Sequence, residues 1–259
     1  MGKKCRNIII AVLAVILGVL ILQTWDRRRA KEPIYKGKPL SQWLTVSGGQ
    51  QSVVSGGISE VMQGVGTNAI PWLLHEASAH DPWPKTLFIN VVRRQSLMKI
   101  PFVTASDREL RARLGLTALG PAGGLAVAQG LTNSDKWTRY GSVGQWEVGK
   151  MYPEIYLPAL LDRLQDREPM IRARAANALG MVGLEPEKVV PALTKALDDP
   201  DEWVRNMAAL GLSCYGPKAK SAMPALLKHL SNSNPDFQYF ATNALRNMAP
   251  ATTIKAGAQ

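Results

Sequence analysis

The chain has 259 residues, of which 46% are hydrophobic, 20% charged and only 7% aromatic. This composition is ordinary for a folded protein, and the scarcity of aromatic residues argues against a β-sandwich and favours closely packed helices. The formal net charge of +11 suggests a nucleic-acid partner, but residues 153–250 hold equal numbers of acidic and basic side chains, so the excess lies elsewhere, largely near the N-terminus.

The first predicted element is a membrane anchor. Residues 7–25 carry no charged side chain, and Ile8 to Leu22 is an unbroken apolar run. A helix of this length spans about 28 Å, which suits a hydrocarbon core of about 30 Å. We therefore predict a single-pass anchor with basic flanks over residues 1–26. A cleaved signal peptide is the alternative, but no small-x-small cleavage site follows. Basic residues on both flanks leave the membrane side of the soluble domain open.

After the anchor we expect a linker with one short helix over residues 27–50, and a tail over residues 253–259. Residues 51–252 are expected to form paired helices, which are clearest over residues 153–250. Weaker pairs precede residue 150, and their exact number stays open. They are residues 53–65 with 68–77, residues 108–119 with 125–131, and residues 137–148 with 153–164.

A 33-residue repeat is the strongest feature of the chain. Residues in both halves of each unit recur at this period, for example Pro158, Pro191 and Pro224, and Ile171, Val204 and Phe237. Within residues 201–215 the apolar positions recur every three or four residues, which predicts a helix that Gly216-Pro217 ends. A two-helix unit buries its apolar faces only against neighbouring units. The sequence therefore predicts an all-α chain folded as an α-α superhelix.

A charged pair recurs with the repeat. Asp166 precedes Arg172 by six residues, and Asp199 precedes Arg205 by the same interval. A catalytic pair should occur once, so we interpret the recurring pair as structural. We expect each aspartate to cap the following helix and each arginine to bond the turn of a neighbouring unit, which makes a ladder along the stack.

The repeat resembles a known family. The string Ala192-Leu193-x3-Leu197-Asp198-Asp199-Pro200-Asp201-x2-Val204-Arg205-x2-Ala208-x3-Leu212 is similar to the HEAT-repeat consensus, including the HEAT-like repeats first named for phycobilisome lyases. In addition, residues 35–44 are similar to a stretch that follows the anchor in bacterial membrane-attached HEAT-repeat proteins. The resemblance implies an armadillo-type superhelix that binds proteins, without fixing the partner. It also implies an alternative, a bilin-lyase-type enzyme, although no residue here recognisably carries that chemistry.

No catalytic, cofactor-binding or metal-binding residue is predicted, and no cofactor is expected. His75 and His80 are five residues apart, which does not place both on one face of a helix, and no third ligand accompanies them. The chain has no Cys-x-x-Cys pair, phosphate-binding loop, Gly-x-Ser-x-Gly elbow or dinucleotide fingerprint.

Two surfaces are candidates for binding. The second helix of each unit is expected to line the inner surface, which makes a possible protein-binding surface of Asp162, Arg163, Lys195, Lys228 and His229. A basic patch within residues 93–113 is the candidate contact for nucleic acid or an anionic surface, and it includes Arg93, Arg94, Arg111 and Arg113. We favour a solvated face for this patch. Among the tryptophans, Trp203 is the candidate for an exposed contact, although we expect it to be partly buried. The function predicted is a membrane-anchored, non-catalytic scaffold for an unknown protein partner.

Overall fold

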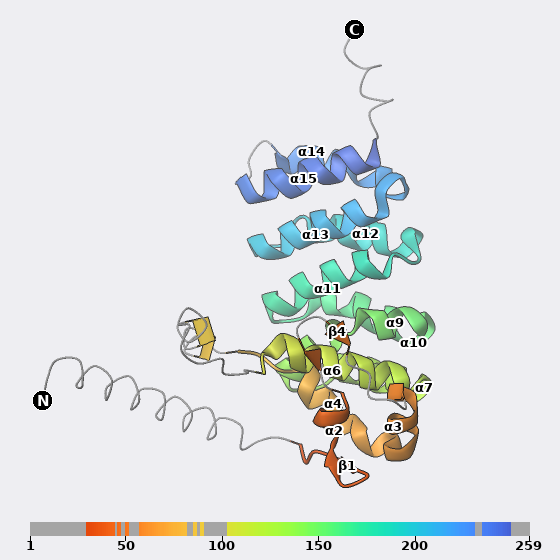
Figure 1. The fold of residues 1–259 in the computed structure, drawn as a ribbon. Coiled ribbons are helices and arrows are strands. Elements are labelled where there is room, and N and C mark those ends of the chain that lie inside the picture. Colours follow the sequence, from red (N-terminus) through yellow and green to blue (C-terminus); the bar gives the residue numbers. More distant parts are fainter. Residues whose placement is uncertain are drawn as a thin grey trace, which may run out of the picture.

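The structure is a stack of paired helices (Figure 1). This computed structural model describes residues 30–44, 46–47, 50–51, 57–81, 85–86, 89–90, 103–230 and 235–249. The predicted anchor over residues 1–26 and the predicted tail over residues 253–259 lie outside the described residues, as do Arg93 and Arg94. Within the described part of the chain, no helix is both long and apolar enough to cross a membrane.

The chain enters the stack through short hairpins. Strand β1 (Ile34–Tyr35) pairs antiparallel with β2 (Lys38–Pro39), and β3 (Val46–Ser47) pairs with β4 (Gln50–Gln51). Between β1 and β2, Lys36 and Gly37 both have positive φ, as a two-residue hairpin turn of the I′ kind requires. A short helix, α2 (Leu40–Trp43), follows β2. The all-α prediction missed both hairpins, because strands of two residues are too short to show an alternating pattern.

The first helical units are irregular. Helix α3 (Gly57–Val65), the 3₁₀ turn η1 (Gly66–Ala69) and helix α4 (Ile70–Ala77) form the first unit. Helices α6 (Ala105–Ala118) and α7 (Pro121–Leu131) form the next. Helix α6 begins at a capping box, in which Thr104 and Asp107 bond each other's backbone N–H groups.

The third unit has a broken first helix. We predicted one helix over residues 137–148, but the structure has α8 (Lys136–Val143) and α9 (Trp146–Met151), followed by α10 (Pro153–Asp162) and η2 (Arg163–Gln165). Glycines at 141, 144 and 149 weaken a continuous helix by about 1 kcal/mol each relative to alanine. The chain turns at the second of them, Gly144, which is the C-cap of α8.

The first helix of each of the three C-terminal units follows the predicted period. They are α11 (Pro169–Val182), α13 (Glu202–Tyr215) and α15 (Pro235–Met248). The second helices are α12 (Pro186–Ala196) and α14 (Met223–Leu230), and α14 is preceded by a 3₁₀ segment, η3 (Gly216–Ala222). The glycine at the end of α11, Gly183, adopts the left-handed conformation that commonly closes a helix.

The two helices of each unit lie in separate layers (Figure 1). Helix α13 packs directly against α11 on one side and α15 on the other, with α12 and α14 behind them. Small residues allow the close approach, since a Cβ atom added to Gly180 would lie only 2.6 Å from Gly211 Cα. The first helices therefore form the tighter layer of the stack.

The predicted ladder is confirmed, and it extends one unit further upstream. Arg172 donates from Nε and Nη2 to the Asp199 carboxylate at 2.8 Å each, and Arg139 bonds Asp166 in the same way. The expected helix cap was wrong. Asp199 accepts the backbone N–H of Asp201 at 2.9 Å, and it is Asp201 that caps α13. The arginine therefore ties its own unit to the turn of the following one.

Helix α15 is the last helix of the stack in the described part of the chain. On α11 and α13, the side that faces the next unit carries buried residues, such as Asn206, Ala209 and Ser213 on α13. The residues one period later on α15 are Tyr239, Thr242 and Arg246, and all three are exposed. Bulky and polar side chains at these positions are typical of the outer side of a terminal repeat.

Candidate protein-binding groove

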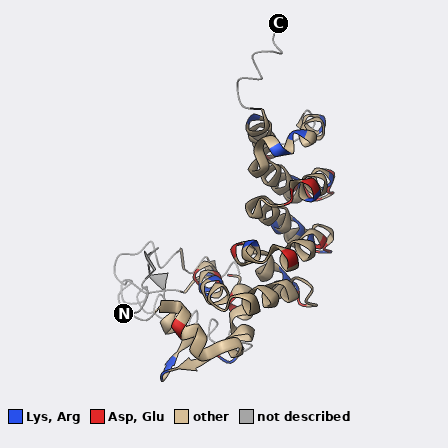
Figure 2. Cartoon of the chain, turned by 90° about the vertical axis from the view of Figure 1, so that its right-hand side faces the viewer, with Lys and Arg blue, Asp and Glu red and all other residues tan. Residues whose placement is uncertain are grey.

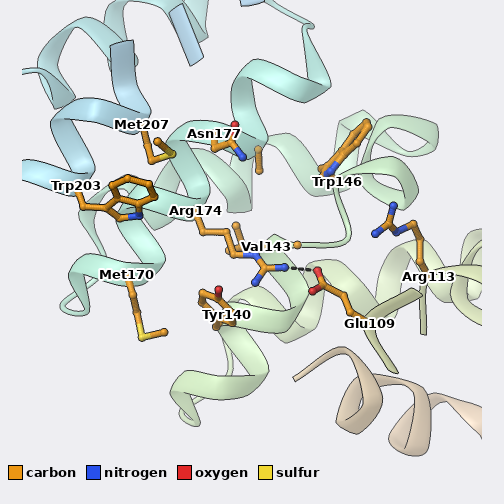
Figure 3. A pocket seen from close by; sticks show the side chains of 12 residues that line it. Glu109, Arg113, Tyr140, Val143, Trp146, Met170, Arg174, Asn177, Trp203 and Met207 are labelled. Atoms are coloured by element: carbon orange, nitrogen blue, oxygen red, sulfur yellow. Dashed lines mark hydrogen bonds and ion pairs between the residues drawn. The ribbon is translucent and has the colours of Figure 1, made fainter. Parts of the chain in front are cut away.

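An open groove of about 350 Å³ runs along the first helices of four consecutive units (Figure 3). Its walls come from α6, α8, α9, α11 and α13. The lining residues are Glu109, Arg113, Tyr140, Val143, Gly144, Trp146, Met170, Arg174, Asn177, Ala178, Trp203 and Met207. The groove is therefore built from side chains of four stacked units.

Arg174 holds the middle of the groove. It reaches from α11 to form an ion pair with Glu109 of α6, and its guanidinium carbon lies 4.0 Å from the centre of the Tyr140 ring (Figure 3). This stacking is a cation–π contact. These three side chains connect α6, α8 and α11, although Glu109 and Arg174 are 65 residues apart in the sequence.

The charged side chains that line the groove all have ion-pair partners. Besides the Arg174–Glu109 pair, Arg113 donates from Nη1 to Glu147 Oε1 at 2.8 Å. Along the rest of the stack, acidic and basic side chains are interspersed instead of being gathered by sign (Figure 2). A surface with interspersed charges has no strong electrostatic field of one sign that would favour a highly charged ligand.

The side of the groove next to the helix starts is apolar. Trp203 stands near the start of α13 with 55% of its surface exposed, more than the partial burial we expected. Met170 occupies the position one period earlier on α11, and both side chains lie on the same side of the groove (Figure 3). A large exposed aromatic side chain with a partly buried methionine beside it is typical of interaction surfaces.

The predicted protein-binding surface lies on other elements. Asp162 and Arg163 lie at the end of α10 and in η2, Lys195 lies on α12, and Lys228 and His229 lie on α14. None of these residues lines the groove. We expected the second helices to form the inner layer, and the glycine contact between α11 and α13 shows that the first helices pack more closely. A binding role for the five residues stays a prediction.

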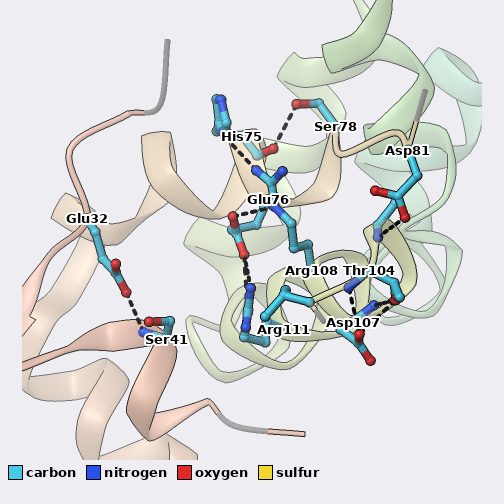
Figure 4. Close-up of polar contacts among 12 residues, drawn as sticks. Glu32, Ser41, His75, Glu76, Ser78, Asp81, Thr104, Asp107, Arg108 and Arg111 are labelled. Atoms are coloured by element: carbon cyan, nitrogen blue, oxygen red, sulfur yellow. Dashed lines mark hydrogen bonds and ion pairs between the residues drawn. The ribbon is translucent and has the colours of Figure 1, made fainter. Parts of the chain in front are cut away.

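The described half of the basic patch is engaged in ion pairs (Figure 4). Arg111 bonds Glu76 from Nη2 at 2.7 Å, and Arg108 bonds the other oxygen of Glu76 from Nε at 2.8 Å. Glu76 is buried on α4, so these contacts fasten α4 to α6. Arg113 is paired with Glu147. The guanidinium groups of Arg108, Arg111 and Arg113 therefore already form ion pairs within the protein.

The groups that the sequence suggested for chemistry have structural contacts. His75 lies 3.1 Å from Arg108, measured from Nδ1 to Nη2, and the His80 ring stacks on Trp137 with centroids 3.8 Å apart. Burial raises the pKa of the Cys214 thiol, which disfavours the nucleophilic thiolate. Among the described residues, no three His, Cys, Asp or Glu side chains are grouped so that they could hold a metal ion.

Comparison with known proteins identifies the repeats. A family model described as HEAT repeats matches residues 125–213 and 190–256, more than half of the chain. A designed armadillo repeat protein in complex with the peptide (KR)4 has a TM-score of 0.48 and 18% identity, over 81% of this chain and 98% of that one. An engineered protein from the Northeast Structural Genomics Consortium has a TM-score of 0.45 and 18% identity, over 74% of this chain and 94% of that one. No curated protein matches the sequence. On the family match, the chain belongs to the HEAT-repeat family.

Proposed function

We propose that this protein is a non-catalytic scaffold that binds another protein through the groove on its first helices and is held at a membrane by residues 7–25. The observation that carries the proposal is the combination of exposed Trp203, with the partly buried Met170 beside it, and lining charges that already have ion-pair partners. A partner gains most from apolar contacts on such a surface, and it need not break strong electrostatic contacts to obtain them.

A protein partner fits this groove better than a small ligand. The groove is open and crosses four units, so it presents a long surface instead of an enclosed pocket. Binding energy in protein interfaces is concentrated in a few residues, with tryptophan and arginine enriched among them. Trp203 at the side of the groove and Arg174 at its centre supply residues of this kind.

Membrane attachment is supported by the sequence. The uncharged residues 7–25 are long enough to cross a bilayer as a helix, and basic residues flank them on both sides. The alternatives have less support. The Arg111 and Arg113 side chains are paired with carboxylates, which weakens the nucleic-acid hypothesis. No described residue favours a lyase-type reaction.

Site-specific photo-crosslinking tests the proposal in native membranes. The photoreactive residue p-benzoylphenylalanine replaces Trp203 in the full-length protein, and in a second variant it replaces Lys228 on α14. We expect a discrete protein adduct from position 203 and none from position 228, because only the former lies in the groove.

The second position also tests the surface predicted from the sequence. An adduct from position 228 alone would move the binding site to the second helices and contradict the groove. The absence of a protein adduct at both positions would contradict the scaffold itself. Expression and membrane content of the two variants are compared by immunoblot, so that yields refer to equal amounts of protein.

A further inference from the structure

The arginines of the ladder share one arrangement of hydrogen bonds to the backbone. Arg139, Arg172 and Arg205 each donate from Nη1 to backbone oxygens five and six residues earlier, in the turn before their own helix. For Arg205 these oxygens belong to Asp199 and Pro200, at 2.8 and 3.0 Å. The turn therefore holds the guanidinium of Arg205 in the same way as it holds the other two.

The three arginines differ at the other edge of the guanidinium, which Nε and Nη2 form. Asp166 accepts both N–H groups of this edge on Arg139, and Asp199 accepts both on Arg172, at 2.8 to 3.1 Å. Among the described residues, no group accepts a hydrogen bond from Nε or Nη2 of Arg205. We call these two nitrogens the open edge of Arg205.

The sequence explains why the open edge lacks a carboxylate. The residue one period after Asp199 is Asn232, which lies outside the described residues. An amide has a single oxygen, so it cannot form the two parallel bonds that a carboxylate forms with Nε and Nη2. The open edge is also accessible, because Arg205 is partly exposed and neither nitrogen of the edge is buried.

Acidic residues near the open edge do not prevent a carboxylate from binding there. Asp199 and Asp201 precede α13, and Asp166 and Glu168 occupy the corresponding positions before α11. The arginine of α11, Arg172, binds a carboxylate in these surroundings. In addition, Asp199 is already bonded by Arg172, and Asp201 accepts a backbone N–H group of α13 at 3.2 Å. The surroundings of the open edge are therefore those of a filled carboxylate site.

We propose that the open edge of Arg205 binds a carboxylate of another protein, supplied by an aspartate or glutamate side chain. The turn already holds the guanidinium, so binding costs less side-chain entropy than it would for a freely rotating arginine. A single ion pair near the surface is weak, so the carboxylate has to belong to a protein that makes further contacts. Arg205 does not line the groove, and the site can therefore be tested independently of it.

A carboxylate placed in the chain itself tests whether the open edge accepts one. Asn232→Asp supplies an aspartate at the position that Asp166 and Asp199 hold in the two preceding units. We expect the Tm of the full-length variant in detergent to rise by about 2 °C or more, because the ladder gains a bidentate ion pair. In an Arg205→Gln background the same substitution should give no rise. An equal change in Tm in the two backgrounds would overturn the proposal.

An NMR titration tests a carboxylate supplied from outside the chain. The probe is a peptide that copies residues 197–201, the acidic turn that binds Arg172, and the control peptide has asparagine in place of each aspartate. The signal followed is the Nε–H group of Arg205 in the ¹⁵N-labelled full-length protein, assigned by its loss in Arg205→Gln. At equal millimolar concentration and ionic strength, the acidic peptide should shift this signal about twofold or more further than the control peptide does, because hydrogen bonds to a charged group are stronger.

Two further arms of the titration make the result specific. In Asn232→Asp the shift caused by the acidic peptide should disappear, because the aspartate in the chain already occupies the open edge. Equal shifts with the two peptides, or an undiminished shift in Asn232→Asp, would overturn the proposal. A larger shift with inorganic phosphate than with the acidic peptide would overturn a carboxylate as the ligand.

Discussion

Replacing Asp166 with alanine is expected to lower the free energy of unfolding by about 3–5 kcal/mol. Asp166 accepts two hydrogen bonds from Arg139, from Nε at 2.8 Å and from Nη2 at 3.1 Å. Only 5% of Arg139 and 7% of Asp166 is exposed, so the substitution leaves a buried guanidinium without its carboxylate. Equilibrium urea unfolding of the full-length protein in detergent, followed by far-UV circular dichroism, measures the change.

Two companion variants make this test specific. Arg167→Ala removes an arginine whose side chain is 73% exposed, and it should change the stability by no more than about 0.5 kcal/mol. Combining Arg139→Met with Asp166→Leu removes both charges and should recover most of the loss, because a buried ion pair contributes little over apolar residues of similar size. A loss below about 1 kcal/mol for Asp166→Ala would contradict the structural role of the ladder.

The stability difference between wild type and Asp166→Ala should change with pH in a predictable direction. Burial by itself raises the pKa of Asp166, but the hydrogen bonds from Arg139 and from the backbone N–H of Glu168 outweigh it and hold the pKa below its ordinary value of 3.8. A carboxyl group with a lowered pKa stabilises the fold above its unfolded pKa, and this contribution disappears as the pH falls through the folded value. The difference between wild type and Asp166→Ala should therefore be full at neutral pH and shrink only below about pH 4.

Gly211→Leu is expected to destabilise the protein by about 3 kcal/mol or more, because the site has no room for a side chain. A Cβ atom at Gly211 would lie 2.5 Å from the backbone oxygen of Ala176. Backbone atoms cannot swing aside as a side chain can, so α11 and α13 would have to separate along their length. Thermal unfolding monitored by circular dichroism reports the loss as a lowered Tm.

The matched control for this substitution is Thr242→Leu. Thr242 is exposed on the side of α15 that faces away from α13, so the same leucine should change the stability by no more than about 0.5 kcal/mol. Equal Tm values for Gly211→Leu and the wild type would show that the close approach of the first helices is not required.

The sequence predicted the repeats well because every unit meets the same surroundings. Ile171, Val204 and Phe237 are all buried at the same place in their units, so each unit needs an apolar residue at that position and the residue recurs at the same interval. The ladder was predictable for the same reason. Its upstream member was less visible, because the position before Arg139 that corresponds to Asp166 is Asn133. Asn133 contributes only its backbone oxygen to the ladder, and this oxygen accepts a hydrogen bond from Arg139 at 2.9 Å.

The layer with the closer helix packing could not be predicted from the same pattern. Both helices of a unit are amphipathic at the same period, so the apolar stripes do not distinguish the tight layer from the open one. The distinction depends on Gly180 and Gly211, which are 31 residues apart, two fewer than the period, and therefore fall outside the aligned series. Their contact becomes visible only when α11 and α13 lie side by side.

The groove itself depends on contacts between units that differ from one another. The Arg174–Glu109 pair joins α11 to α6, and the position one period after Arg174 is Met207, so no periodic signal marks the arginine. Trp203 was identified as a candidate because it stands next to acidic residues at a helix start. The exposure of the Trp203 side chain depends on whether neighbouring units cover the start of α13. The sequence alone does not show this.

The most direct test of the scaffold is the affinity of the partner captured by crosslinking at position 203. The full-length protein in nanodiscs is immobilised, and the dissociation constant of that partner is measured by biolayer interferometry for wild type, Trp203→Ala and Lys228→Ala. A tryptophan buried by a partner commonly contributes about 2 kcal/mol or more, so Trp203→Ala should weaken binding by about thirtyfold while Lys228→Ala changes it by less than about twofold. An affinity for Trp203→Ala within about twofold of wild type would contradict binding through the groove.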